Sequence, residues 1–179
     1  VGADYLRGRV KNVHLIPHGC VRKPTEELWN IFQSPYTIVQ FGFGFKYKGM
    51  DRAVRAVHRL KSTDPKYQDI QYLCLVSCNE HNRPANQAYA GELRRLADSL
   101  GLSENVAILQ GYFTDDQLSS YLRTARMAIF PYVSDPANVV YGASGAVRLA
   151  MAHGTPTIAS ESHMFDDLDG VLPRPDGHV

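Results

Sequence analysis

A glycine-rich segment carries the residues with the clearest potential for chemistry. Gly42, Gly44, Lys46 and Lys48 follow one another closely, directly before a helical pattern. Glycine lets the backbone approach a ligand, a helix N-terminus offers unpaired N–H groups, and two lysines add positive charge. The segment is therefore a candidate phosphate site, with a tight turn that carries solvated lysines as the alternative. Its spacing fits neither the dinucleotide fingerprint nor the P-loop.

A second segment of small residues precedes a later helical pattern. Tyr141, Gly142, Ser144 and Gly145 would expose the N–H groups of that helix start. Ser144 either caps the helix or donates to a bound anion, and the residue types do not decide between these roles.

A third loop follows an apolar strand pattern. Gly111, Tyr112 and Phe113 combine aromatic side chains with exposed backbone amides, which suit a nucleobase, although the two aromatics also fit partly buried anchors of the loop. Cys74 and Cys78 have no set of partners with the paired spacing of a zinc site, so we interpret them as free thiols and predict no metal site.

Secondary-structure elements must position these loops. Short continuous apolar runs are typical of strands covered on both faces, and apolar residues at i, i+3, i+4 and i+7 indicate amphipathic helices. The predicted strands are 13–16, 37–43, 70–76, 106–109, 127–131, 157–159 and 171–172. The predicted helices are 49–61, 84–100, 114–125 and 144–153. Their alternation predicts an α/β fold, a Rossmann-like doubly wound parallel sheet whose ligands bind at the C-terminal ends of strands.

The composition excludes several classes of protein. Nineteen basic and 18 acidic residues leave a net charge of +1, which argues against a nucleic-acid or membrane-surface partner. No apolar run reaches the roughly 20 residues of a transmembrane segment. Three cysteines, an odd number, favour a reducing compartment, and we expect a cytoplasmic protein. Because the chain starts at Val1, we expect a fragment with one domain: a strand and linker over 1–35, then the main βα units over 36–179.

Five segments in collinear order resemble the C-terminal domain of GT-B glycosyltransferases, in particular the retaining glycosyl transferases group 1 family. They cover residues 13–19, 41–51, 111–118, 125–131 and 149–160. The last of them reads L-A-M-A-H-G-T-P-T-I-A-S and is similar to the family signature E-A-M-A-x-G-x-P-V-I-A-S.

The resemblance implies a hexosyltransferase that retains the anomeric configuration. Its co-substrate would be a nucleotide-diphosphate sugar, held without cofactor or metal because lysines and helix N-termini neutralise the leaving diphosphate. Lys46 and Lys48 would then be catalytic, and the glycines, aromatics and Ser144 of the three loops would bind the donor. The acceptor would bind mainly to an N-terminal domain missing from this chain, so we expect the fragment alone to be inactive.

The sequence departs from the family at three positions. Tyr141 and Leu149 stand where the family has two glutamates, and Phe43 stands where an arginine is frequent. These replacements leave a non-catalytic GT-B-like domain, which binds a nucleotide or a partner, as the alternative function. A GT-B epimerase or phosphorylase is a third reading, for which the sequence carries no signature.

Overall fold

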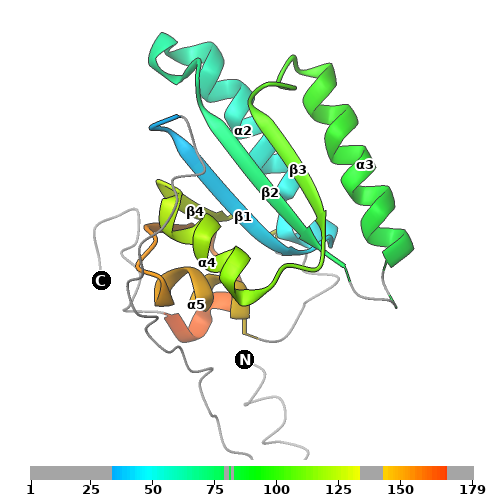
Figure 1. Cartoon of the computed structure of the whole chain (residues 1–179), viewed down its shortest axis with the longest axis vertical. Coiled ribbons are helices and arrows are strands. Elements are labelled where there is room, and N and C mark those ends of the chain that lie inside the picture. Colours follow the sequence, from blue (N-terminus) through cyan, green and yellow to red (C-terminus); the bar gives the residue numbers. More distant parts are fainter. Residues whose placement is uncertain (1–33, 79–80, 82, 134–142, 169–179) are drawn as a thin grey trace, which may run out of the picture.

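A five-stranded parallel sheet forms the centre of the computed structural model, which describes residues 34–78, 81, 83–133 and 143–168 (Figure 1). The strand order is β3-β2-β1-β4-β5. The strands are β1 (Thr37–Phe43), β2 (Gln71–Ser77), β3 (Val106–Gly111), β4 (Met127–Phe130) and β5 (Thr157–Ala159). All four pairings are parallel, which confirms the predicted fold class.

The direction in which the chain adds strands to the sheet reverses between β1 and β4, although the two strands are parallel. From β1 the chain builds outward through β2 to β3, then returns across the sheet to β4 and β5 on the other side. The segments that follow β1 and β4 therefore leave neighbouring strand ends in opposite directions. In open α/β sheets the crevice at such a topological switch point is the usual place for a ligand.

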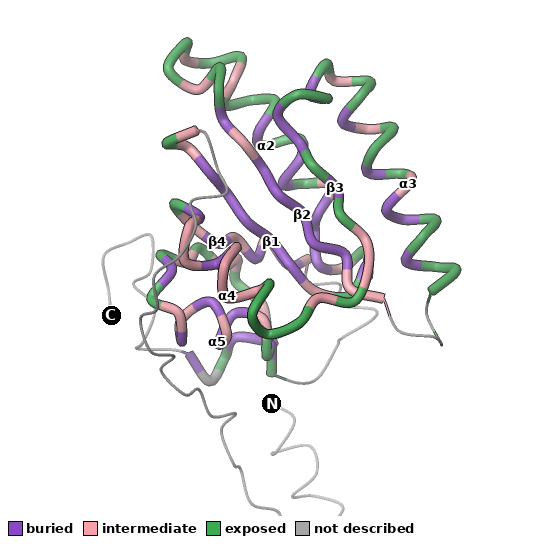
Figure 2. The backbone as a smooth tube through the Cα atoms, in the orientation of Figure 1, coloured by how far each residue is buried: buried purple, intermediate pink, exposed green. Residues whose placement is uncertain are grey.

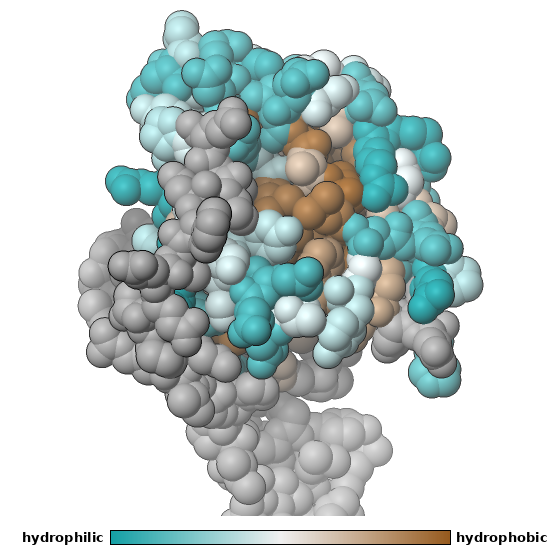
Figure 3. Space-filling model, viewed as in Figure 1, coloured by the Kyte–Doolittle hydropathy of each residue, from teal (hydrophilic) through white to brown (hydrophobic). Residues whose placement is uncertain are grey.

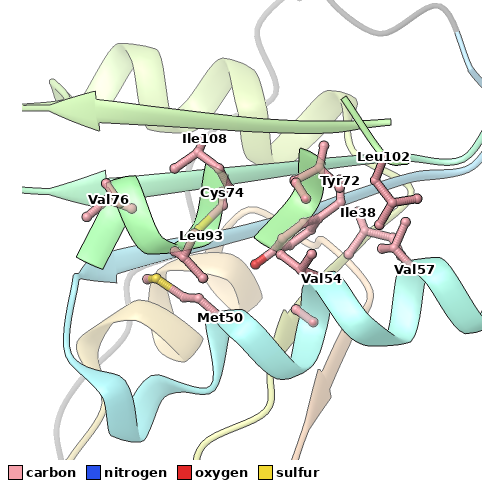
Figure 4. Close-up of a cluster of buried hydrophobic side chains, with 14 of the residues drawn as sticks. Ile38, Met50, Val54, Val57, Tyr72, Cys74, Val76, Leu93, Leu102 and Ile108 are labelled. Carbon is pink, nitrogen blue, oxygen red and sulfur yellow. The ribbon is translucent and has the colours of Figure 1, made fainter. Parts of the chain in front are cut away.

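Helices α2 (Met50–Thr63) and α3 (Arg83–Ser99) cover one face of the sheet. Met50 and Val54 of α2 and Leu93 of α3 pack against Tyr72 and Cys74 of β2 (Figure 4). The buried positions of α2 repeat every three to four residues, as its apolar periodicity predicts, while its arginines remain exposed.

Helices α4 (Asp115–Thr124) and α5 (Gly145–Ala152) and the 3-10 helix η3 (His163–Leu168) pack on the opposite face. A capping box begins α4: Thr114 Oγ1 accepts from the Gln117 N–H, and Gln117 Oε1 accepts from the Thr114 N–H. Burial is deepest along β1 and β2 (Figure 2). Apolar side chains remain visible over β2 and β3, where Leu109 is 39% exposed (Figure 3).

The predicted elements match those of the structure within one or two residues at most ends. None of the three 3-10 helices, η1 (Lys46–Lys48), η2 (Pro65–Tyr67) and η3, was predicted, because three to six residues are too few to show a period. The predicted strands 13–16 and 171–172 lie outside the described residues, and the division at residue 35 stays a prediction. None of the helices in the described ranges is long and apolar enough to cross a membrane.

Candidate functional site

Two glycines shape the connection between β1 and α2 at the switch point. Gly42 has a φ of +136° and Gly49 a φ of +65°, values that favour glycine. A Cβ atom on Gly49 would collide with the carbonyl oxygen of Pro131, directly after β4. The Val133 N–H also donates to the Tyr47 carbonyl over 2.6 Å. The turn η1 is therefore fixed against the end of β4.

This turn places Lys48 at the switch point, between the ends of β1 and β4. The residue is only 7% exposed, and its ammonium donates to the Tyr132 hydroxyl over 2.6 Å. The same Nζ lies 4.5 Å from the centre of the Tyr132 ring. A Cβ atom on Gly42 would come within 3.2 Å of it, so the side chain crosses the strand end where glycine leaves room.

Ser144 joins Lys48 to the start of α5 through Tyr132. The Tyr132 hydroxyl lies 3.1 Å from Ser144 Oγ, and Ser144 is 3% exposed. Although Ser144 is the N-cap residue, its side chain makes no capping bond. Arg148 donates to the Ser144 carbonyl over 2.9 Å and holds this first turn. We call Lys48, Tyr132 and Ser144 the switch-point cluster.

A polar link through the core supports the backbone of Lys48. Gln40, fully buried in β1, donates from Nε2 to the Lys48 carbonyl over 2.8 Å. Its Oε1 accepts from the Tyr72 hydroxyl over 2.7 Å. Buried polar groups that are fully paired fix a geometry, because breaking any one bond leaves an unsatisfied group in the core.

The cluster holds a positive charge in a poorly hydrated place. Burial lowers the pKa of Lys48 to about 8, so the ammonium is mostly protonated at pH 7. Burial raises the pKa of Tyr132 to about 12, which keeps the phenol neutral. No carboxylate of the described chain lies within ion-pair distance of Lys48 Nζ. A buried cation without a counter-charge is an arrangement that an anionic ligand stabilises.

Lys46 and Gly44 lie apart from this cluster. The Lys46 side chain is 79% exposed and its ammonium lies 3.3 Å from the Glu92 carboxylate on α3. A Cβ atom on Gly44 would meet Val76 at 2.9 Å and Asn86 at 3.1 Å, so close packing requires glycine there. A catalytic role for Lys46 and a donor contact for Gly44 stay predictions.

The structure separates the third predicted loop from the cluster. Gly111 ends β3 at the edge of the sheet, with β2 and β1 between it and the crevice. Tyr112 is 84% exposed, whereas Phe113 is half-buried against the core. Gly145 begins α5 beside Ser144, and Tyr141 and Gly142 lie outside the described residues. Contacts of these residues with a donor stay predictions.

Tyr132, Gln40 and Arg148 are the residues of the site that the sequence analysis missed. Gln40 had a visible signal, because it interrupts an apolar strand with an amide. Tyr132 follows a predicted strand, in one of the loops where ligands were expected. Arg148 had no such signal: a helical arginine is usually exposed, yet this one is 3% exposed.

Cys74 and Cys78 are free thiols, the first buried and the second half-buried, as predicted. Among the described residues, no group of three or more His, Cys, Asp or Glu side chains is placed to hold a metal. The expectation that the reaction needs no metal stays a prediction.

Comparison with known sequences identifies one family. Residues 35–176 match the sequence profile of the family described as "Glycosyl transferases group 1". No curated protein sequence matches the chain significantly.

Solved structures share the fold at low sequence identity. A UDP-forming α,α-trehalose-phosphate synthase from Burkholderia xenovorans superposes with a TM-score of 0.61 at 12% identity, over 75% of this chain and 32% of that one. The pneumococcal O-GlcNAc transferase GtfA, in complex with UDP and GlcNAc, superposes with a TM-score of 0.62 at 15% identity, over 89% of this chain and 28% of that one. Anabaena HepE, in complex with UDP, superposes with a TM-score of 0.56 at 16% identity, over 74% of this chain and 32% of that one. The chain spans about a third of the length of these proteins.

Proposed function

Since the chain belongs to the glycosyl transferases group 1 family, we propose that it is the donor-binding domain of a glycosyltransferase. It would hold a nucleotide-diphosphate sugar while a hexosyl group passes to an acceptor. The observation that carries this proposal is Lys48: a buried, protonated ammonium at the switch point, beside the start of α5.

The geometry of the ammonium suits a diphosphate. An ammonium has three N–H donors, and Tyr132 accepts one of them, which leaves two for phosphate oxygens. The N–H groups at the start of α5 lie across Tyr132 from Lys48 and add the positive end of the helix dipole. As the bond to the sugar breaks, negative charge grows on the leaving phosphate. A fixed cation in a poorly hydrated crevice stabilises that charge more than it stabilises the ground state.

UDP is the first nucleotide to test, because structural relatives were solved with UDP bound. The acceptor would be held by a second domain outside these 179 residues, with the donor between the two domains. Retention of anomeric configuration, independence from metal and a cytoplasmic site of action belong to the same proposal.

A non-catalytic binding domain is the second candidate, and Leu149 favours it. The family has a glutamate at this position, but Leu149 lies half-buried against the apolar core of α5 and β4. A leucine side chain accepts no hydrogen bond from a donor hydroxyl. This second candidate binds a nucleotide or a partner and transfers no sugar, so an assay of the full-length protein with UDP-sugars decides between the two.

Thermal unfolding with UDP, GDP, ADP and TDP and their monophosphates tests the proposal. Ligand at 100 times its Kd stabilises a protein by about 2.7 kcal/mol, which raises the Tm of a domain this size by several degrees. We expect a shift with one or more diphosphates that the Lys48→Met variant loses and the Lys66→Met variant, changed at an exposed lysine of η2, keeps. The absence of a shift with every nucleotide, or an equal shift in Lys48→Met, would contradict donor binding at Lys48.

A further inference from the structure

A cavity of about 610 Å³ lies between α2 and α3, and no residue of the switch-point cluster lines it. Its volume falls in the range of small-molecule sites. The lining comes from η1, the first turns of α2, the middle of α3 and the segment after β4. It consists of Lys46, Tyr47, Asp51, Arg52, Arg55, Tyr89, Glu92, Leu93, Leu96 and Val133.

Three of the charged groups in this cavity already have partners. Glu92 pairs with Lys46 over 3.3 Å. Asp51 accepts from the Tyr89 hydroxyl over 3.2 Å. The Lys46–Glu92 pair is neutral as a whole, whereas Asp51 keeps its negative charge, so the charged groups of the lining together leave an excess of one positive charge.

Arg52 and Arg55 differ from these pairs. They lie three residues apart on α2 and so share one face of the helix, at the rim of the cavity. Within the described residues, neither guanidinium makes a hydrogen bond or an ion pair. Two such groups offer planar arrays of N–H donors that match the oxygens of a phosphate bidentately.

The inner wall of the cavity is apolar. Leu93 is 1% exposed and Tyr89 6%, and both belong to the core beneath α2 and α3. The Tyr47 ring adds an aromatic side wall, fixed by its edge contact with Tyr132, with ring centroids 5.8 Å apart. An occupant therefore meets an apolar surface at the base and positive charge at the rim.

We propose that the α2–α3 cavity is a second binding site, which takes a phosphate monoester with a flat apolar body. The phosphate lies between Arg52 and Arg55, because these two guanidinium groups offer N–H donors in pairs that match phosphate oxygens. The apolar body enters toward Leu93 and Leu96 and packs beside Tyr47. This site is distinct from the proposed nucleotide site, because none of Lys48, Tyr132 and Ser144 lines the cavity.

Phenyl phosphate is the probe, titrated into the 179-residue chain by calorimetry. We expect saturable binding that weakens about tenfold or more in the Arg52→Gln/Arg55→Gln double variant, which loses charge-assisted hydrogen bonds. Arg59→Gln is the matched control: the same change on an exposed residue of the same helix, outside the cavity lining. Inorganic phosphate and phenol should each bind more weakly than phenyl phosphate, because each lacks half of the contacts.

Two further binding measurements distinguish this site from the proposed nucleotide site. Lys48→Met should bind phenyl phosphate as the unaltered chain does, and saturating UDP should leave that binding unchanged. Competition by UDP, equal weakening in Arg59→Gln, or equal affinity for inorganic phosphate would each overturn the proposal. So would the absence of saturable binding at millimolar probe. Failure of every nucleoside diphosphate to bind would contradict the proposed function and would leave the proposal for this second site intact.

Discussion

The ammonium of Lys48 is hydrogen-bonded to a neutral phenol rather than to a carboxylate. This choice of partner keeps the positive charge available for a ligand, but it destabilises the folded chain. The pKa of Lys48 falls from 10.5 to about 8, which lowers the free energy of unfolding by about 3 kcal/mol at neutral pH. The unfolded chain binds this proton more tightly, so the penalty is complete below pH 8. It disappears as the pH rises from about 8 to 10.5.

Replacing Lys48 should therefore stabilise the domain while it removes nucleotide binding. Lys48→Met keeps the apolar stem and removes the charge, and we expect unfolding at pH 7 to require about 1–3 kcal/mol more free energy. The gain should shrink toward pH 10. Urea unfolding at both pH values measures this gain. A Lys48→Met variant less stable than the parent at pH 7 would contradict the claim that the buried charge destabilises the folded chain.

The affinity for a nucleoside diphosphate should fall as the pH rises above about 8, where Lys48 loses its proton. The terminal phosphate, with a pKa of about 6, is already ionised there. Burial raises the pKa values of Tyr47 and Tyr132, the phenols that face the ammonium, so neither titrates first. Calorimetry of UDP binding from pH 7 to 9.5 measures the slope. The UDP affinity of Lys48→Arg should not change over this pH range. An equal fall in affinity in that variant would show that a group other than Lys48 titrates.

The Tyr132 hydroxyl should position Lys48 for the ligand. Tyr132→Phe keeps the ring contact and removes the acceptor, and we expect diphosphate affinity to fall about three- to tenfold with about 1 kcal/mol of lost stability. Tyr121→Phe is the control, since the Tyr121 hydroxyl makes no hydrogen bond within the described residues. Equal affinity in Tyr132→Phe and the parent would show that the ring alone seats the ammonium.

The elements of the site are held together at Gly49, where η1 ends and α2 begins. Its left-handed backbone turns the chain, and its missing side chain lets the loop rest on the Pro131 carbonyl. The β1 and β4 ends thereby keep a fixed spacing, on which the Lys48–Tyr132 bond depends.

Gly49→Ala should destabilise the domain far more than an alanine at another left-handed glycine. Gly101 has nearly the same φ, +66°, but a Cβ atom there meets nothing within 4 Å. We expect Gly101→Ala to reduce stability by about 1 kcal/mol, through backbone strain alone. Gly49→Ala adds a backbone collision and should reduce stability by more than about 3 kcal/mol. Denaturant unfolding of both variants checks this. Similar losses of stability in the two variants would show that the contact with Pro131 does not limit the side chain at position 49.

At the scale of the whole molecule, the sequence predicted the fold better than the site. Apolar runs and helical periods, such as those of Val39 and Val54, report burial directly, so the sheet and its helices could be found. The contacts of Lys48 with Tyr132 depend on strands that are distant in sequence, and no local pattern carries them. Lys46 and Lys48 look alike in sequence, yet the tight turn η1 sends one into the crevice and the other to α3.

Donor binding at the switch point is best tested by an amide NMR titration of the 179-residue chain with UDP. Binding there predicts the largest shift changes at Lys48, Gly49, Ser144 and Gly145, with small changes at Arg52 and Arg55. The same titration of Lys48→Met should show none of them at equal UDP. Saturable changes confined to other residues, or none with UDP, GDP, ADP or TDP at millimolar concentration, would contradict the proposal that the switch point holds the diphosphate of a sugar donor.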